Sequence, residues 1–278
     1  MIQDFTTNSL RRYLSEGGGA GFFLIAGPCV VESRELVLEV AERLVSISQE
    51  LGIPLVFKGS FRKANRSRLD SFTTIGEERA LTILAEVREH FGVPVLTDIH
   101  ESHEAAVVAR FVDILQIPAF LSRQTDLLVA AGKTGKMVNI KKGQFLSPQA
   151  MRYVAEKVSE TGNDAILLTE RGTTFGYNDL VVDFRNVLEM KELGYPVVVD
   201  ASHSLQRPNT QNGVTGGDPQ YIEAMALAAI ATGADGLFIE THPSPASALS
   251  DAESMLPLSQ MEPLLRKAVC VRAALREV

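Results

Sequence analysis

The chain has few cysteines and no long apolar run. Its 278 residues include two cysteines, Cys29 and Cys270, too few for a disulfide framework and typical of a reducing compartment. No stretch approaches the roughly 18 consecutive apolar residues of a membrane helix, and the N-terminal lead, residues 1–21, has no apolar stretch of signal-peptide length. We therefore expect a cytoplasmic protein with no membrane partner, in which Cys29 is free for metal or redox chemistry and Cys270 packs in the core.

An excess of basic residues is also missing. The formal net charge is -7, which argues against nucleic acid or an anionic membrane as partner. Hydrophobic residues make up 45% and charged residues 22% of the chain, a composition that suits a globular protein with a large core. We expect residues 1–278 to form a single domain.

Eight short apolar runs recur along the sequence, each rich in β-forming residues and bounded by Gly, Pro or charge. Nearly every run ends in a residue that can bind an anion, a metal or a proton. The runs are Phe22–Ala26, Pro54–Phe57, Val95–Thr97, Ile114–Leu115, Met137–Ile140, Ala165–Thr169, Val197–Val199 and Leu237–Ile239.

Segments with helical spacing separate these runs: Arg34–Leu51, Glu77–Phe91, Pro148–Glu160, Leu180–Leu193 and Pro219–Thr232. Alternating strands and helices predict parallel strands. Eight such units predict one α/β domain folded as a (β/α)8 TIM barrel with a short N-terminal extension, and the chemistry of such barrels gathers at the carboxyl ends of the strands. A doubly wound open sheet is the alternative, but Gly27-Pro28-Cys29 follows the first strand in place of a glycine-rich dinucleotide fingerprint.

Basic residues gather at or just beyond the predicted strand ends, although the chain is acidic overall. Arg donates hydrogen bonds in a fork and Lys supplies a compact charge, a mixture that suits phosphate recognition. A solvated basic loop is the structural alternative for the segment 58–67 alone, but cations from other strands reach the same face of a barrel. The set is Lys58, Arg62, Lys63, Arg66, Lys141, Lys142 and Arg171, and it predicts a small, multiply anionic substrate.

A second set combines a thiol, an imidazole and two carboxylates: Cys29, His203, Glu240 and Asp251. These groups suit a divalent transition metal with room for water or substrate. Taken singly, Cys29 and His203 are more often buried core residues, and neither a CxxC nor an HxxxH pair is present. In a closed ring, however, the first, seventh and eighth strands are neighbours, which favours a shared site.

Several other polar residues are less diagnostic. Asp98 and His100 either orient a substrate or satisfy backbone groups, and His242 is placed to support the metal ligands. His90 and His103 are expected to be structural or solvated. The segment Arg207–Pro219 is rich in Asn and Gly and predicts a lid after the seventh strand.

At these residues the sequence resembles the 3-deoxy-D-manno-octulosonate 8-phosphate synthase family. The resemblance runs from Phe22 to Leu258 through IAGPCVVES, KGSFRKANRS, QIPAFLSRQTDL, NIKKGQFLSP, TERGTTFGYNDLVVD, DASHS and FIETHPSPASALSDA. It implies a TIM barrel, commonly a homotetramer, that condenses phosphoenolpyruvate with arabinose 5-phosphate and water and releases inorganic phosphate, in lipopolysaccharide (KDO) biosynthesis.

The resemblance also implies a role for individual residues. Phosphoenolpyruvate would contact Lys58, Ser60, Lys63, Gln116, Ala119, Lys141 and Arg171, and the sugar phosphate would contact Asn65, Arg66 and Ser67, with Arg123 reaching it from a neighbouring subunit. The catalytic residues would be Cys29, Lys63, Lys141, His203 and Asp251. Cys29, with SDA around Asp251 and KKG before Gln144, resembles the metal-dependent branch, in which Zn, Fe, Mn or Co would occupy the site.

Two other functions stay open at this point. A related synthase joins phosphoenolpyruvate to erythrose 4-phosphate in aromatic biosynthesis, but its counterpart of KANRS typically reads Lys-Pro-Arg-Thr, which Ala64-Asn65 does not match. A barrel that binds a phosphosugar without turnover is the third reading, because intact residues do not prove catalysis.

Overall fold

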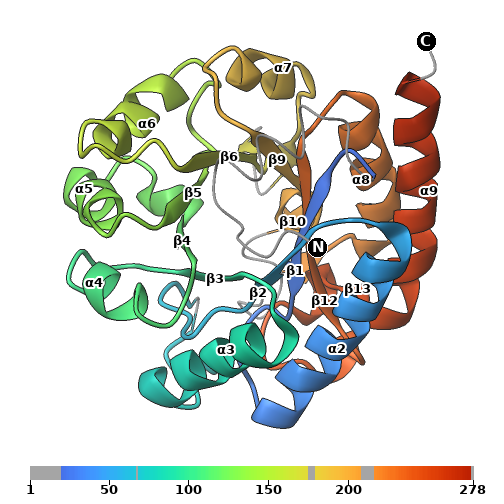
Figure 1. Cartoon of the computed structure of the whole chain (residues 1–278), viewed down its shortest axis with the longest axis horizontal. Coiled ribbons are helices and arrows are strands. Elements are labelled where there is room, and N and C mark those ends of the chain that lie inside the picture. Colours follow the sequence, from blue (N-terminus) through green and yellow to red (C-terminus); the bar gives the residue numbers. More distant parts are fainter. Residues whose placement is uncertain (1–19, 67, 175–178, 208–215, 277–278) are drawn as a thin grey trace.

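Eight parallel strands close into a ring in the computed structural model, which describes residues 20–66, 68–174, 179–207 and 216–276 (Figure 1). The strand order around the ring is β1, β2, β3, β4, β5, β6, β9 and β12, and β1 also pairs with β12. The strands are β1 (Phe23–Gly27), β2 (Leu55–Lys58), β3 (Val95–Asp98), β4 (Ile114–Ile117), β5 (Met137–Lys141), β6 (Ile166–Glu170), β9 (Val197–Asp200) and β12 (Gly236–His242). Because β1 bonds to both β2 and β12, the predicted TIM barrel is confirmed and the open doubly wound sheet is wrong.

Helices surround the ring (Figure 1). They are α2 (Arg34–Leu51), α3 (Glu77–Phe91), α4 (Glu104–Val108), α5 (Thr125–Lys133), α6 (Met151–Ser159), α7 (Arg185–Lys191), α8 (Ile222–Ala231) and α9 (Leu258–Arg276). Ser33 caps α2 by accepting a hydrogen bond from the Leu36 N–H, and Gly52 ends it at φ 64°, a left-handed conformation that glycine adopts without strain. None of the described helices is long and apolar enough to cross a membrane.

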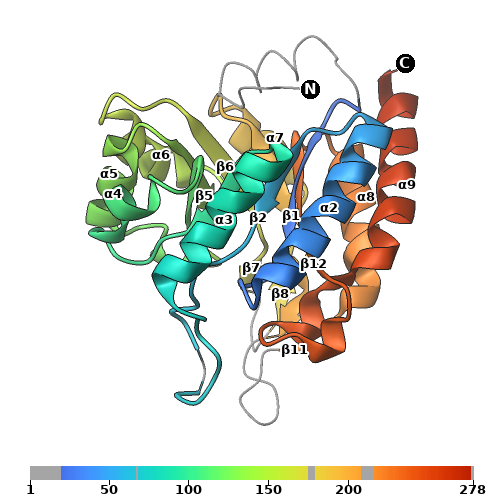
Figure 2. The same ribbon diagram turned by 60° about the horizontal axis from the view of Figure 1, so that its bottom comes forward.

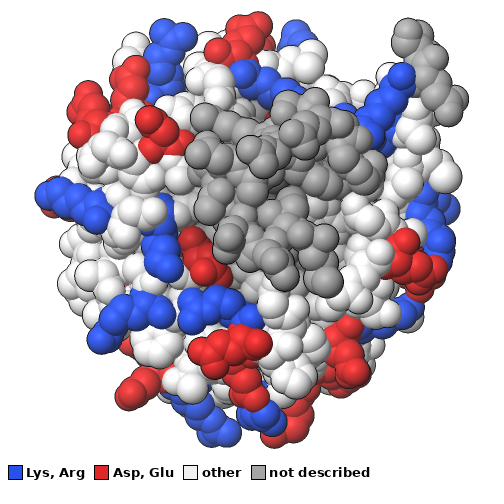
Figure 3. Space-filling view, viewed as in Figure 1, with Lys and Arg blue, Asp and Glu red and all other residues white. Residues whose placement is uncertain are grey.

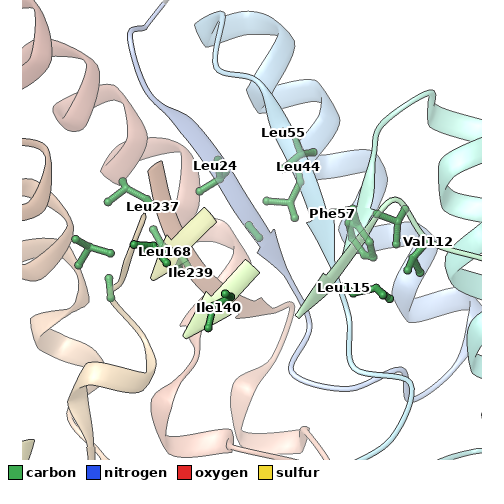
Figure 4. Packing of buried hydrophobic residues seen from close by; sticks show 14 of the residues in the cluster. Leu24, Leu44, Leu55, Phe57, Val112, Leu115, Ile140, Leu168, Leu237 and Ile239 are labelled. Atoms are coloured by element: carbon green, nitrogen blue, oxygen red, sulfur yellow. The ribbon is translucent and has the colours of Figure 1, made fainter. Parts of the chain in front are cut away.

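Each barrel strand places alternate side chains on opposite faces of the sheet. The outward residues pack against the helices, and Figure 4 shows Leu24, Phe57, Leu115, Ile140, Leu168 and Leu237 among them. The inward residues fill the lower barrel as a separate apolar cluster, made of Phe23, Ile25, Val56, Leu96, Ile114, Met137, Leu167, Val198 and Phe238. The barrel interior is therefore a packed core up to the level of these residues.

Two expectations about local structure are wrong. Leu180–Val181 forms strand β8, which pairs antiparallel with β7 (Thr173–Thr174), and helix α7 begins only at Arg185. Cys270 lies on an exposed face of α9, because the buried stripe of that helix falls on Met261, Leu264, Leu265 and Ala268.

The base of the expected lid is a two-stranded ribbon of β10 (Gln206–Arg207) and β11 (Gly216–Gly217). Residues 208–215 of that segment lie outside the described residues. A Cβ on Gly217 would stand 2.6 Å from the Glu253 carbonyl oxygen, so glycine lets the ribbon pack against the helix η6 (Ala252–Ser254). Strands β7, β8 and β11 gather at one end of the barrel, together with the long connection between β2 and α3 (Figure 2).

Candidate active site

Polar residues replace apolar ones at the next inward position of seven of the eight barrel strands, and β1 has Gly27 there. The strands alternate with a period of two, so the residues two places beyond Val56, Leu96, Ile114 and Phe238 also face the interior. The upper layer of inward side chains is polar, and all of its members are buried: Lys58, Asp98, Gln116, Asn139, Thr169, Asp200 and Glu240. The buried polar side chains therefore gather at the carboxyl end of the barrel, where the sequence predicts the chemistry.

Gly27 brings the ends of β1 and β2 together. A Cβ at this position would lie 1.9 Å from the Lys58 carbonyl oxygen, so no other residue fits without moving the backbone. Beyond this point Val31 N–H donates to the Ser60 carbonyl at 2.9 Å, and Ser60 N–H donates to that of Cys29 at 3.3 Å. The backbone thus fixes Cys29 beside the loop that carries Lys63.

Three of the four predicted metal ligands converge. The ligand atoms of Cys29, Glu240 and Asp251 all lie within 4.8 Å of one another. His203 does not join that group, although its Nε2 lies 3.3 Å from Glu240 Oε1. The structure thus brings together a thiol and two carboxylates, and it places the imidazole beside one of them.

The electrostatics of this group fit a cation. Burial, together with the negative charges of Asp251 and Glu240, raises the pKa of the Cys29 thiol, and Lys63 and Lys58 oppose the rise only in part. Glu240 Oε2 is buried and has no hydrogen-bond partner among the described residues. A divalent metal would stabilise the Cys29 thiolate and so lower the pKa of the thiol, and it would give Glu240 Oε2 a partner. These residues therefore fit a metal.

The backbone of Asp251 is unusual. Its φ of 49° and ψ of 34° are left-handed, and no other non-glycine residue in the described part of the chain has positive φ. Such a conformation costs on the order of 1 kcal/mol and concentrates at functional sites, with Asp among the residues that tolerate it best. Here it accompanies an aspartate whose Oδ2 lies 3.1 Å from Cys29 Sγ.

His203 sits in a network of charged groups. Its Nδ1 lies 2.7 Å from Asp200 Oδ2 and 3.3 Å from Lys141 Nζ. Lys141 itself donates to Asp200 at 2.6 Å and lies 3.8 Å from the ring centroid of Phe238. Burial would raise the pKa of Asp200, but His203 and Lys141 hold it below its usual range, so Asp200 stays ionised.

Lys58, Lys141 and Arg171 are buried at the barrel end, and Lys63 is half-buried. Lys58 is only 1% exposed and donates to Glu240 Oε1 and to the Cys29 carbonyl oxygen at 2.7 Å. Arg171 donates to the His203 carbonyl oxygen at 3.0 Å and to Gln206 Oε1 at 2.9 Å. Burial would lower the pKa of Lys63, but the negative groups around it, led by Cys29 and Glu240, outweigh burial and raise it. Lys63 therefore keeps its charge.

On the face of the molecule that Figure 3 shows, positive and negative side chains are interspersed around the residues drawn in grey. Burial lowers the pKa of both Lys141 and Arg171, although Asp200 opposes it in each case. The buried positive charges thus lie at the carboxyl end of the barrel, where Lys58 pairs with Glu240 and Lys141 with Asp200.

One prediction about the basic residues at the strand ends is wrong: Lys142 does not face the site. Lys142 follows an inward residue, so its side chain points out of the barrel. It lies 3.5 Å from Glu170 Oε1 and donates to Thr173 Oγ1 at 3.1 Å, fully buried. Its role is to hold the loops after β5 and β6 together.

A second residue of that basic set, Arg62, is already paired with a carboxylate. Arg62 Nε donates to Glu104 Oε1 at 2.9 Å. Glu104 in turn accepts the His100 N–H at 2.6 Å. His100 also contacts Asp98, with 3.0 Å between Nε2 and Oδ2, so these residues bind the end of β3 to the start of α4.

The predicted sugar-phosphate residues lie on two separate segments. Asn65 is exposed, Arg66 is half-buried and Ser67 lies outside the described residues. Arg66 donates to the Phe72 carbonyl oxygen at 2.8 Å and to Ser250 Oγ at 2.5 Å. Arg123 is exposed just after the helix η1 (Ala119–Leu121).

Sequence reasoning missed several residues of the site. Asn139 donates to Gln116 Oε1 at 3.0 Å and accepts from Thr169 Oγ1 at 2.6 Å, a chain that crosses three adjacent strands. The sequence carried a signal for Asn139, because it is a polar residue at an inward position of an otherwise apolar strand. Ser250 and Glu32 carried no such signal, yet Glu32 accepts the Leu249 N–H at 2.9 Å and ties the β12 loop to the β1 loop.

A closed barrel with buried cations and a thiol–carboxylate group at the carboxyl ends of its strands is the arrangement of an enzyme that binds a small anionic substrate. Comparison with known proteins gives the family. The model of the DAHP synthetase I family matches residues 6–276, and the chain belongs to this family.

Curated relatives cover nearly the whole chain. The 2-dehydro-3-deoxyphosphooctonate aldolase of Trichlorobacter lovleyi is 51% identical over 260 residues, which is 94% of this chain and 96% of the relative. The protein of that name from Cyanothece sp. is 52% identical over 262 residues, with the same two coverages. The one from Granulibacter bethesdensis is 54% identical over 251 residues, 90% of this chain and 89% of its own.

Proposed function

We propose that this protein is a 3-deoxy-D-manno-octulosonate 8-phosphate synthase, also called 2-dehydro-3-deoxyphosphooctonate aldolase. It is a transferase that condenses phosphoenolpyruvate with arabinose 5-phosphate and water, releases inorganic phosphate and supplies lipopolysaccharide biosynthesis. The observation that carries this function is the convergence of buried Lys58, Lys141 and Arg171 with Cys29, Glu240 and Asp251 at one barrel end, in a chain about half identical to enzymes of that name.

Phosphoenolpyruvate lies among the buried cations. Lys63, Lys141 and Arg171 hold its phosphate and carboxylate, and Lys58, Gln116 and Ala119 line the same space. Ser60 adds a hydroxyl, because its Oγ is buried without a hydrogen-bond partner among the described residues. Charge-assisted hydrogen bonds of this kind are stronger than neutral ones and fix the orientation of the acid.

The reaction joins the enol carbon of phosphoenolpyruvate to the aldehyde carbon of the sugar, while the oxygen of water adds to the carbon that bears the phosphate. Phosphate then leaves with its bridging oxygen. Holding the two substrates with their reacting atoms near contact supplies much of the rate enhancement. Little further translational and rotational freedom is then lost in reaching the transition state. A bound divalent metal supplies Lewis acidity, for the aldehyde or for the attacking water.

Asp200 fixes the orientation of the His203 imidazole. Asp200 lies 2.7 Å from the ring Nδ1, which leaves Nε2 facing the site and Glu240. Lys141 connects the same aspartate to the bound acid. Removing the Asp200 carboxylate would free both groups to reorient, a common cause of lost catalysis.

The enzyme is of the metal-dependent type. Cys29, Glu240 and Asp251 hold the metal, and His203 completes the set from its position beside Glu240. Thiolate, imidazole and carboxylate together accept Zn, Fe, Mn or Co, and availability decides among them. Incubation with a chelator and restoration with each metal would test both the requirement and the choice.

The sugar phosphate binds at the outer end of the site, to Asn65, Arg66 and Ser67. Arg123 contributes from a neighbouring subunit of a homotetramer. Two observations support an assembly at this side of the barrel: Phe120 and Phe145 are 60% and 56% exposed, and the ring of Phe145 stands close to Gly143 and the loop that leads to Arg123. Large aromatic side chains left in water favour burial against a partner.

The related erythrose 4-phosphate synthase is the second candidate, because the description of the matching family names that activity. Ala64-Asn65 argues against it, and so do the names of the curated relatives. Phosphate release measured with both sugars at saturating metal decides the question. We expect turnover with arabinose 5-phosphate and slow release with erythrose 4-phosphate; the reverse preference would refute the assignment, and binding without release would indicate a silent barrel.

A further inference from the structure

Ser250 lies between the two halves of the site. It precedes Asp251, is only 4% exposed, and its Oγ contacts two groups from distant parts of the chain. Arg66 Nη2 donates to this oxygen at 2.5 Å, and Cys29 Sγ lies 3.1 Å from it. One hydroxyl thus connects the loop after β2, the turn after β1 and the loop after β12.

Ser250 precedes one proposed metal ligand, Asp251, and contacts another, Cys29, so a metal held by both would also fix the serine. The single S–H of Cys29 has two acceptors, Ser250 Oγ and Asp251 Oδ2, each 3.1 Å from the sulfur. A metal-bound thiolate cannot donate, so the serine O–H turns toward the sulfur and leaves its lone pairs to the guanidinium. The chain Arg66 N–H to Ser250 O–H to Cys29 S⁻ is then charge-assisted at both ends, and such chains strengthen cooperatively.

Arg66 needs no rearrangement to bind a ligand from this position. A guanidinium has five N–H donors, and the described contacts use one on Phe72 and one on Ser250. The other donors can meet a phosphate while Ser250 holds the side chain. Holding a long side chain in place beforehand reduces the entropy that its ligand must overcome.

We propose that Ser250 is a positioning residue that links the metal thiolate Cys29 to Arg66, so that the metal and the sugar phosphate bind with positive cooperativity. The part that concerns the sugar rests on the proposed function. Because linkage is reciprocal, the sugar phosphate must tighten the metal by the same factor as the metal tightens the sugar phosphate.

The test uses Co²⁺ as probe on the metal-free full chain, with and without arabinose 5-phosphate and with phosphoenolpyruvate absent, so that nothing turns over. In the wild type the sugar phosphate should tighten Co²⁺ at least about fivefold, the low end of ordinary couplings. In Ser250→Ala the effect should fall below about twofold, while Ser250→Thr, which keeps the hydroxyl, retains it.

Ser247→Ala is the matched control, because Ser247 is an exposed serine of the same loop. Coupling undiminished in Ser250→Ala, or absent from a wild type that binds the sugar phosphate, would overturn the proposal.

A second measurement needs no sugar. Co²⁺ affinity and the thiolate-to-cobalt absorption band are compared in wild type, Arg66→Ala, Ser250→Ala and the double variant. If Ser250 transmits the effect of Arg66, the second substitution adds nothing to the first, whereas additive losses would contradict the relay. Non-additive losses in a protein that fails to bind arabinose 5-phosphate would reject the proposed function and leave the relay standing.

Discussion

At the scale of single residues, the site depends on placing like charges together. Cys29, Glu240 and Asp251 lie within 4.8 Å of one another, and Asp251 adopts a left-handed backbone to join them. Neither feature stabilises the fold by itself. Both are understandable if a cation occupies the space between the three side chains.

Cys29→Asn tests this interpretation. Losing the thiolate removes the softest ligand and one negative charge, so the affinity for Zn or Fe should fall by more than the roughly 10–100-fold that loss of an outer hydrogen-bond partner costs. His203, Glu240 and Asp251 can still order water, so we expect a folded variant with little metal and weak activity that a chelator does not affect. Metal analysis and assays with chelator give the answer, and undiminished metal content would show that Cys29 is an ordinary core cysteine.

Arg66→Ala should separate the two substrates. It would remove the charge-assisted contact proposed for the sugar phosphate, about 1.5–3 kcal/mol, and should raise the KM for arabinose 5-phosphate roughly 10- to 100-fold at saturating metal, with a much smaller change for phosphoenolpyruvate. Arg68→Ala is the control, since Arg68 lies in the same loop and pairs with exposed Asp70. An equal rise for both substrates would place Arg66 elsewhere.

At the scale of elements, the end of β3 and the start of α4 are joined by charge. Glu104 accepts the N–H groups of His100 and Glu101 at 2.6 and 3.1 Å. Burial alone would lower the pKa of His100, but the hydrogen bond to Asp98 and the negative charges of Asp98 and Glu104, whose Oε2 lies 3.7 Å from His100 Nδ1, raise it to about 9. The joint therefore contains a histidine that is charged at neutral pH.

This joint should give a stability difference that depends on pH. A histidine with a raised pKa contributes fully below its unfolded value of 6.5 and loses that contribution as the pH rises through about 9. His100→Gln should therefore cost up to on the order of 3 kcal/mol near pH 6, because each tenfold change in proton affinity contributes about 1.4 kcal/mol. The cost should shrink near pH 10. Urea unfolding of both proteins at the two pH values measures it, and a constant difference would contradict the charged joint.

The sequence predicted long elements better than short ones. Helices α2 and α3 begin and end where expected, because Gly52 and Gly92 stop them in left-handed conformations. Segment 180–193 was misjudged at its start: the spacing of Leu180 and Val181 suits a helix, but pairing with Thr173 and Thr174 makes them a strand. That pairing is a tertiary contact, which local spacing does not encode.

At the scale of the whole molecule, closure of the barrel explains which of the predicted site residues lie together. Alternation along a strand predicts that Lys58, Gln116 and Glu240 share the interior, and ring closure makes β1 a neighbour of β12. The same alternation, applied to Lys142, would have turned it outward. Contacts such as Arg66 to Ser250 join loops 184 residues apart, and no periodicity in the sequence specifies them.

The proposed homotetramer is the easiest property of the whole molecule to test. Phe120 and Phe145 expose apolar rings beside the loop that carries Arg123, and burying such rings against a second copy would contribute about 1.5–3 kcal/mol each. Replacing both residues by Asp removes this apolar burial and also places unpaired charges in the contact, so the free energy of association becomes unfavourable. We expect the double variant to sediment as a smaller species at micromolar concentration and to show a raised KM for arabinose 5-phosphate, because Arg123 would no longer reach the neighbouring site.

Circular dichroism and bound metal should match the wild type, since both residues lie away from the barrel core. The same substitution at Tyr153, which is exposed on α6, serves as a control for surface charge. An unchanged assembly in the double variant would move the interface to another face of the barrel.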